Sequence, residues 1–122
     1  MLKLSRFAQK VLQEDFDRRE IVPELCRYLT RIWPERISNL SEKALFEKVR
    51  HSCLIARGFE LRSGIDLYCF VALDVIICPG FYERDAIASV LRREGSSDDM
   101  RMFEVLAQAP FRAWSLMMKN HP

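Results

Sequence analysis

The sequence predicts an all-α protein, a single-domain bundle of five or six helices packed around a central apolar helix at about residues 64–78. Its long periodic segments repeat their apolar residues at spacings of three and four, which is the helical period. A chain of 122 residues has room for one domain, residues 1–122 here, and such a domain buries about two-thirds of its unfolded surface. No repeat, low-complexity tract or linker divides the chain.

The central helix is predicted from its length, its acidic residues and its boundaries. A membrane helix needs ~20 apolar residues, whereas the segment 65–78 is shorter, carries Asp66 and Asp74, and ends before Pro79-Gly80. A buried strand is ~4 to 8 residues long, yet the apolar character here persists over about three helical turns. Ser63 is placed to cap a helix, with Asp66 three residues later as in a capping box.

The N-terminal region, residues 3–33, predicts one kinked helix or two. Pro23 occupies a position that a first helical turn accepts, and Trp33 precedes Pro34, which ends the segment. Residues 3 to about 17 form an amphipathic pattern, whose apolar members are Leu4, Phe7, Ala8, Val11, Leu12 and Phe16. The central helix is apolar on most sides and must be covered by other segments. We therefore expect the N-terminal segments to pack against it.

Three further helices follow from caps and periodicity. One begins after Ser41 and ends at Gly58, and a short one runs from Glu83 to about Arg93. A last helix begins after Ser97, and Pro110 kinks it or starts a separate helix. The apolar stripe of this last helix consists of Phe103, Leu106, Pro110, Trp114 and Met117.

Charge and cysteine usage predict a cytoplasmic protein with no nucleic-acid partner and no membrane insertion. Nineteen basic and seventeen acidic residues give a net charge of +2, which indicates no polyanion-binding stripe. Residues 1–20 lack the apolar core of a secretory signal. Cys26, Cys53, Cys69 and Cys78 form no C-x-x-C pair, so we expect free, reduced and mostly buried thiols.

No catalytic, cofactor or metal site is predicted, and the chain is interpreted as a non-enzyme. His51 and Cys53 are two residues apart on one helix and point about 200° apart, so they do not meet. Asp66 and Asp74 are too distant to act together, and we interpret them as a cap and a hydrogen-bond acceptor. The four glycines are not clustered, which excludes a phosphate-binding loop.

One resemblance supplies a function. Between Trp33 and Arg93 the chain has an aromatic-proline pair ending a helix, a long helix closing with alanine, an aromatic before a tight turn, a capped aliphatic helix and a following phenylalanine. The positions are Trp33-Pro34, Ala56, Phe59, Ser63, Asp66, Phe70-Val71, Leu73 and Phe81. This pattern resembles the small helical proteins encoded beside type VI secretion effectors and their adaptor chaperones. Glu60 and Cys78 stand where that family usually has glycine.

The resemblance implies a non-enzymatic co-chaperone. It would bind an effector-specific chaperone, a type VI secretion effector or both, stabilise the effector and assist its loading onto the secretion spike. The alternative is an immunity protein that neutralises a cognate toxin by binding it. The partner's identity, the stoichiometry, the binding face and homo-oligomerisation remain open at this stage.

A binding surface is predicted after the central helix. Because Pro79-Gly80 stops that helix, we expect the following rings to lie exposed on a turn, where they would anchor a partner. Substituting Tyr82 or Arg84 with alanine is therefore expected to weaken partner binding. The full predicted set is Phe81, Tyr82, Arg84, Trp114 and Met118.

Overall fold

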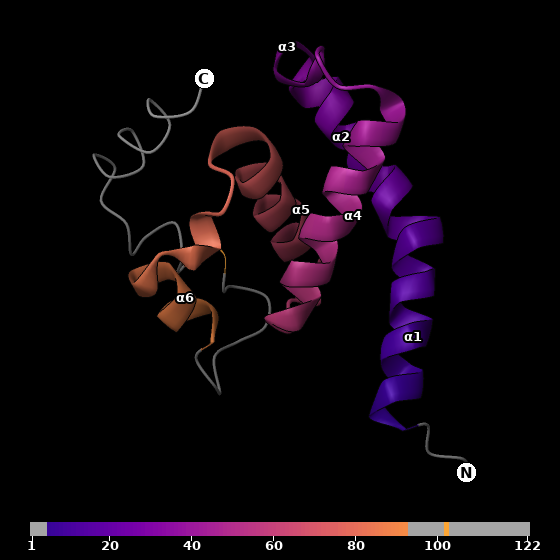
Figure 1. The fold of residues 1–122 in the computed structure, drawn as a ribbon, viewed down its shortest axis with the longest axis vertical. Coiled ribbons are helices and arrows are strands. Elements are labelled where there is room, and N and C mark those ends of the chain that lie inside the picture. The colour runs from indigo at the N-terminus through magenta and orange to yellow at the C-terminus, as the bar shows by residue number, and fades with distance from the viewer. Residues whose placement is uncertain (1–4, 93–101, 103–122) are drawn as a thin grey trace.

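A computed structural model describes residues 5–92 and Met102, and this part of the chain consists of helices joined by short turns and loops, with no strand (Figure 1). The all-α prediction is therefore confirmed. The predicted last helix after Ser97, including Trp114 and Met118, lies outside the described residues. The elements in chain order are α1 (Arg6–Phe16), η1 (Asp17–Ile21), α2 (Val22–Ile32), α3 (Pro34–Ile37), α4 (Glu42–Gly58), α5 (Gly64–Ala72), η2 (Leu73–Ile77), η3 (Phe81–Glu83) and α6 (Asp85–Leu91).

α1, η1 and α2 form one helical rod from residue 6 to residue 32, with a widened turn in its middle. The backbone stays in the right-handed helical region at Phe16 (φ −60°, ψ −47°) and at Val22 (φ −60°, ψ −46°). In η1 the Val22 N–H donates to the Asp17 carbonyl five residues earlier, as in a π-helix. Trp33 leaves the helical region with ψ 50° just before Pro34. The region predicted as one kinked helix or two is thus a single helix that changes direction at η1 (Figure 1).

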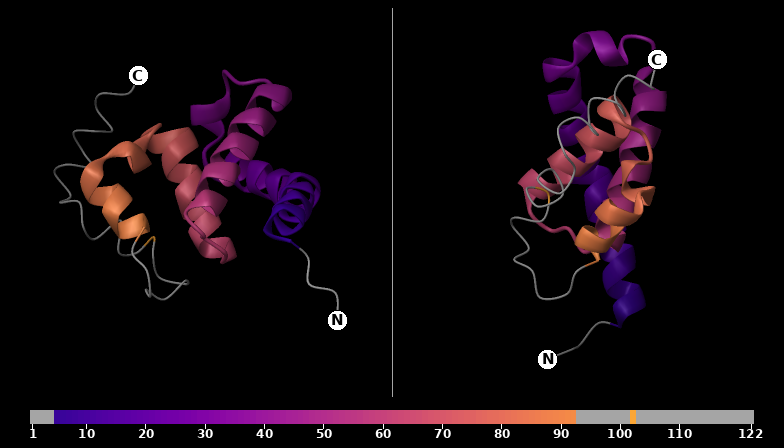
Figure 2. Two further views of the ribbon diagram at one scale, coloured as in Figure 1. Left: turned by 60° about the horizontal axis from the view of Figure 1, so that its bottom comes forward. Right: turned by 90° about the vertical axis from the view of Figure 1, so that its left-hand side faces the viewer.

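α4, which has 17 residues, is the longest uninterrupted α-helix among the described residues and packs on both sides. The Ser41 hydroxyl accepts a hydrogen bond from the Ala44 N–H at 3.0 Å, as its capping role predicts. α4 contacts α2 and η1 on one side and α5 and η2 on the other. Figures 1 and 2 show it between the helical rod and α5. α4 therefore fixes the position of α2 relative to α5.

The predicted apolar helix is present as α5 continued by the π-helical turn η2. The Ser63 hydroxyl accepts from the Asp66 N–H at 3.1 Å, which confirms the predicted cap. After η2 the chain turns at Gly80, whose φ of 76° lies in the left-handed region that glycine tolerates. The position of this helix at the centre of a complete bundle stays a prediction, because the last helix lies outside the described residues.

The core of the described part gathers around α4 and α5. Phe70 is fully buried and contacts the rings of Phe59, Phe81 and Tyr82 at centroid distances of 6.1, 5.0 and 5.5 Å. Aliphatic side chains from α2, α4, α5 and α6 complete it, among them Leu25, Leu29, Val49, Leu67, Val71, Ile87 and Leu91.

Candidate functional site

The structure corrects the predicted binding surface after α5. Phe81 is only 1% exposed, so the expectation that its ring lies open as an anchor is wrong. The left-handed backbone at Gly80 and the short 3₁₀ turn η3 fold the Phe81 ring edge-on against Phe70. Tyr82 is half-buried and its ring stacks on that of Phe70 with centroids 5.5 Å apart, whereas Arg84 is exposed. Arg84 is therefore the one described member of the predicted set that is freely accessible.

His51 and Cys53 do not meet, as expected from the sequence. His51 is exposed and Cys53 is 1% exposed, on different sides of α4, as the helical geometry predicts. The Cys53 thiol lies 3.7 Å from the Asp17 Oδ2 atom. Burial, followed by the charge of Asp17, raises the pKa of Cys53 to about 12. A thiol so strongly protonated at neutral pH is not a nucleophile.

The four cysteines are free, and none of them is more reactive than an ordinary thiol. Cys53 and Cys78 are buried, whereas Cys26 and Cys69 are half-buried. Burial raises the pKa of Cys26, Cys69 and Cys78 as well. The prediction of free thiols is confirmed. The prediction that the thiols are mostly buried is confirmed for Cys53 and Cys78, whereas Cys26 and Cys69 are only partly buried.

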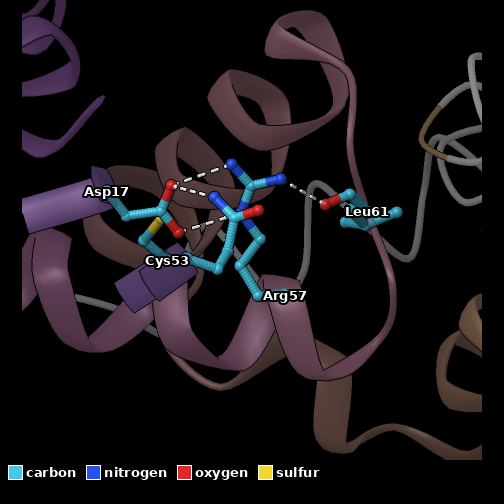
Figure 3. A network of polar contacts seen from close by, with 5 residues as sticks. Asp17, Cys53, Arg57 and Leu61 are labelled. Carbon is cyan, nitrogen blue, oxygen red and sulfur yellow. Dashed lines mark hydrogen bonds and ion pairs between the residues drawn. The ribbon is translucent and has the colours of Figure 1, made fainter. Parts of the chain in front are cut away.

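A buried ion pair connects the helical rod to α4 (Figure 3). Arg57 donates from Nε to Asp17 Oδ2 and from Nη2 to Asp17 Oδ1, both at 2.9 Å. Its Nη1 donates to the carbonyl of Leu61 at 3.1 Å. The Gln13 side-chain amide donates to Asp17 Oδ1 at 3.0 Å. One guanidinium thus joins the rod, α4 and the loop that leads into α5.

Sequence reasoning missed this pair. Asp17 and Arg57 are 40 residues apart, so no local spacing relates them. Asp17 ends the amphipathic pattern of α1 and Arg57 precedes Gly58, which made both look like ordinary polar residues near helix ends. Their geometry is that of a structural clamp, because both carboxylate oxygens and all three guanidinium nitrogens already have partners within the protein.

The two central aspartates also have structural partners. Asp74 Oδ1 accepts from the Gly80 N–H at 2.9 Å, which confirms its predicted hydrogen bond and stabilises the turn after η2. Asp66 is fully buried, and its Oδ1 accepts from the Met102 N–H at 3.3 Å. The Asp66 side chain thus contacts Met102, 36 residues later in the chain, a contact that its predicted role as a cap did not include.

The candidate site is an apolar groove between α2 and α5. The two helices meet where Tyr28 and Tyr68 pack edge-to-face with ring centroids 6.2 Å apart. The groove has a volume of about 850 Å³, and it is lined by Ile21, Glu24, Leu25, Tyr28, Ile32, Ser63, Gly64, Ile65, Leu67 and Tyr68. Tyr28, Ile32 and Ile65 are 44%, 52% and 64% exposed. Large apolar side chains that line a concave surface and remain open to water mark a binding site.

An apolar stripe continues from this groove onto α1. The stripe consists of Leu12, Phe16, Ile21, Tyr28 and Ile32. Because η1 is a wide turn with i→i+5 hydrogen bonds, the spacing of five from Phe16 to Ile21 still places both residues on one side of the rod. Without that turn the apolar faces of α1 and α2 would diverge. The stripe therefore runs along the whole rod.

The structure also corrects the expected packing of α1. Its apolar residues were expected to cover the central helix, but α1 has no buried residue in the described structure. Phe7, Val11, Leu12 and Phe16 are 77%, 48%, 55% and 46% exposed. The reason lies in the rod, which carries α1 away from α5 beyond the end of α2 (Figure 1). α1 therefore gains little stability from packing within the described residues and depends on its continuity with η1 and α2.

The described residues show neither a metal-binding cluster nor a membrane-spanning helix. Across residues 5–92 and Met102, no three histidine, cysteine, aspartate or glutamate side chains gather where they would hold a metal ion. Among the same residues, no helix combines the length and the apolar character needed to cross a bilayer. Comparison with models of protein families, with curated proteins and with solved structures finds no match to this chain.

Proposed function

We propose that this protein is a non-enzymatic co-chaperone that holds an amphipathic helix of a protein partner in the groove between α2 and α5. The observation that carries the proposal is the groove itself, an apolar cleft of about 850 Å³ whose large side chains are open to water. Helix-in-groove binding uses such a surface and requires neither a cofactor nor a titrating group.

The groove has the length and the apolar lining needed to bind a helix. Along α2 it extends from Ile21 to Ile32, which corresponds to ~16 Å or three turns of a bound helix. α4 lies behind α2 and α5 and contacts both. A fourth helix laid between α2 and α5 would therefore complete a four-helix arrangement, with its apolar ridge against Leu25 and Leu67.

The resemblance of residues 33–93 to accessory proteins of type VI secretion supports a particular partner. We propose that the bound helix belongs to a secretion effector or to its adaptor chaperone, in the bacterial cytoplasm. Binding would cover apolar helical surface of the effector before loading onto the secretion spike. A co-chaperone of this kind works through the stability of its surface, and the Asp17–Arg57 clamp supports the α2 wall of the groove.

The test is co-purification of the tagged protein with the products of the flanking genes. Ile65→Glu places a charge at the exposed rim of the groove and is expected to reduce partner capture at least tenfold while the circular dichroism spectrum is unchanged. Lys48→Glu, on the exposed side of α4, is the matched control and is expected to have no effect.

The identity of the captured protein decides between roles. Capture of an effector or of its adaptor chaperone supports the co-chaperone role. Capture of an isolated toxin domain, with loss of toxicity, would establish the immunity role instead. Full capture by Ile65→Glu would show that the groove is not the binding site.

A further inference from the structure

We infer that, in the absence of a client, the groove is occupied by α1 of a second copy of this protein, in a reciprocal antiparallel dimer. The inference rests on the proposed function, because it assigns a resident occupant to the same groove that a client helix would enter. Dimerisation then protects the apolar surface and regulates access to it.

α1 and the groove both expose apolar side chains, and their lengths match. α1 is an eleven-residue helix with an exposed apolar face, and the groove spans the length of α2, which also has eleven residues. Each of the two surfaces lacks apolar cover within the described residues. α1 of a second copy would cover the groove and would itself be buried by the same contact.

The exposed apolar area is that of an interface. The exposed fractions of Leu12, Phe16, Tyr28, Ile32 and Ile65 run from 44% to 64%. Because a full aromatic side chain presents ~150–250 Å² and an aliphatic one somewhat less, these fractions amount to roughly 500 Å² per copy. A standard stable interface buries ~800 Å² per partner, of which ~60% is apolar, so the exposed apolar area matches what such an interface needs. A single client helix in the groove would cover Tyr28, Ile32 and Ile65 and leave α1 exposed.

The geometry of the rod permits a reciprocal contact. α1 and the α2 wall of the groove lie at opposite ends of one continuous helix, on either side of η1. Figures 1 and 2 show α1 extending beyond the rest of the described helices. If two rods lie antiparallel about a two-fold axis near η1, α1 of each copy lies along α2 of the other. The contact is then reciprocal and closed, as two-fold interfaces are.

The apolar stripe of Leu12, Phe16, Ile21, Tyr28 and Ile32 crosses the junction at η1 without interruption. In the antiparallel arrangement the α1 half of one stripe meets the α2 half of the other. A π-helical turn that keeps the two halves on one side is therefore a requirement of the dimer.

The experiment measures association of the full-length protein by sedimentation equilibrium. The wild type is expected to be a dimer, and Leu12→Glu in α1 and Ile65→Glu in the groove are each expected to raise the dimer dissociation constant at least tenfold. Both positions are more than half exposed, so neither substitution disturbs the core. Lys48→Glu is the control and is expected to remain as dimeric as the wild type.

Mixing the two variants tests the reciprocal arrangement. A heterodimer of Leu12→Glu with Ile65→Glu retains one intact contact, between the α1 of the second variant and the groove of the first. The mixture is therefore expected to associate more tightly than either variant alone. An interface built from α1 against α1 would not be rescued by mixing, and that result would overturn the inference.

The remaining outcomes separate this inference from the proposed function. A wild type that is monomeric at tens of micromolar, or a dimer that both variants leave intact, would overturn the dimer, and loss of client capture by Ile65→Glu would still support the groove. Conversely, a complementing dimer whose groove variant captures the client at wild-type level would retain the dimer and remove the proposed function.

Discussion

Arg57 and Asp17 form a bidentate ion pair with both nitrogen–oxygen distances at 2.9 Å, although they are 40 residues apart in the chain. Their side chains are 19% and 5% exposed. This pair fixes the widened turn η1 to α4, while α1 has no buried residue among those described. The direction in which α1 leaves the body of the protein therefore depends on this polar clamp.

Breaking the clamp from one side is expected to be costly. Arg57→Met leaves the Asp17 carboxylate buried without its counter-ion, and we expect the free energy of unfolding to fall by ~3 kcal/mol or more. Urea denaturation measures the loss. Arg50→Ala removes the exposed Glu47–Arg50 pair and is the control, with an expected change of less than ~1 kcal/mol. If the two substitutions lowered the free energy of unfolding equally, the clamp would contribute no more to stability than an exposed ion pair.

The raised pKa of the Cys53 thiol predicts that the protein loses stability at alkaline pH. Its pKa is raised by burial from 9.0 to about 12 in the folded state. Below pH 9.0 both states keep the proton and the contribution of Cys53 is fully present; between pH 9.0 and about 12 only the unfolded state loses it. The free energy of unfolding should therefore fall with pH in this window, by up to ~1.4 kcal/mol per pH unit from this group.

Comparison with Cys53→Ala isolates that effect. At pH 8 the wild type is expected to be more stable than the variant, because the substitution leaves a cavity in the core. The difference in unfolding free energy should narrow as the pH rises from 9 to 10.5. A constant difference across this range would contradict the raised pKa.

The ring cluster predicts different outcomes for three neighbouring positions. Phe70→Ala is expected to reduce stability by ~3 to 5 kcal/mol, because it removes a fully buried ring. Tyr82→Ala should reduce stability as well, since its ring stacks on Phe70, so it is no longer a clean test of binding. Arg84→Ala should be neutral for stability, within ~0.5 kcal/mol. Thermal unfolding of the three variants gives the order, and a neutral Tyr82→Ala would be inconsistent with the stacked geometry.

Glu60 and Gly80 both have a positive φ, so Glu60→Gly and Gly80→Ala are expected to change the stability in opposite directions. Glu60 has a φ of 63°, where an L residue is strained, and the Leu61 N–H closes the end of α4 by donating to the Ala56 carbonyl at 3.2 Å. Glu60→Gly is therefore expected to stabilise the protein by ~1 kcal/mol. The glycine usual in the resembling family would adopt the backbone conformation that Glu60 already has.

The converse change at Gly80 is expected to destabilise the protein. Its φ is 76°, and an added Cβ would lie 3.4 Å from the Glu83 carboxylate, so Gly80→Ala should cost ~1 to 2 kcal/mol. Gly58→Ala is the control, because a Cβ there meets nothing within 4 Å; at the end of α4 it should be neutral or stabilising. Chemical denaturation of the three glycine-related variants measures the contrast, which would fail if Gly80→Ala matched the wild type.

The sequence by itself determined the helices and their ends. Apolar spacing identified α1, α2, α4 and α5, and the serines at 41 and 63 and the Pro34 stop marked their limits. These signals are local, because caps, periodicity and proline geometry act within one or two turns of the residue that carries them. For the same reason Asp74 was read correctly, since its partner Gly80 lies only six residues away.

Only the tertiary structure decided which side chains meet across the chain and which surfaces stay open. Asp17 pairs with Arg57, 40 residues away, and Asp66 accepts a hydrogen bond from Met102, 36 residues away. The Phe81 ring is buried because it packs edge-on against the Phe70 ring. The groove likewise depends on how α4 spaces α2 and α5. Such contacts form where packing buries the most apolar surface while polar groups keep partners, a balance over many elements that no single segment encodes.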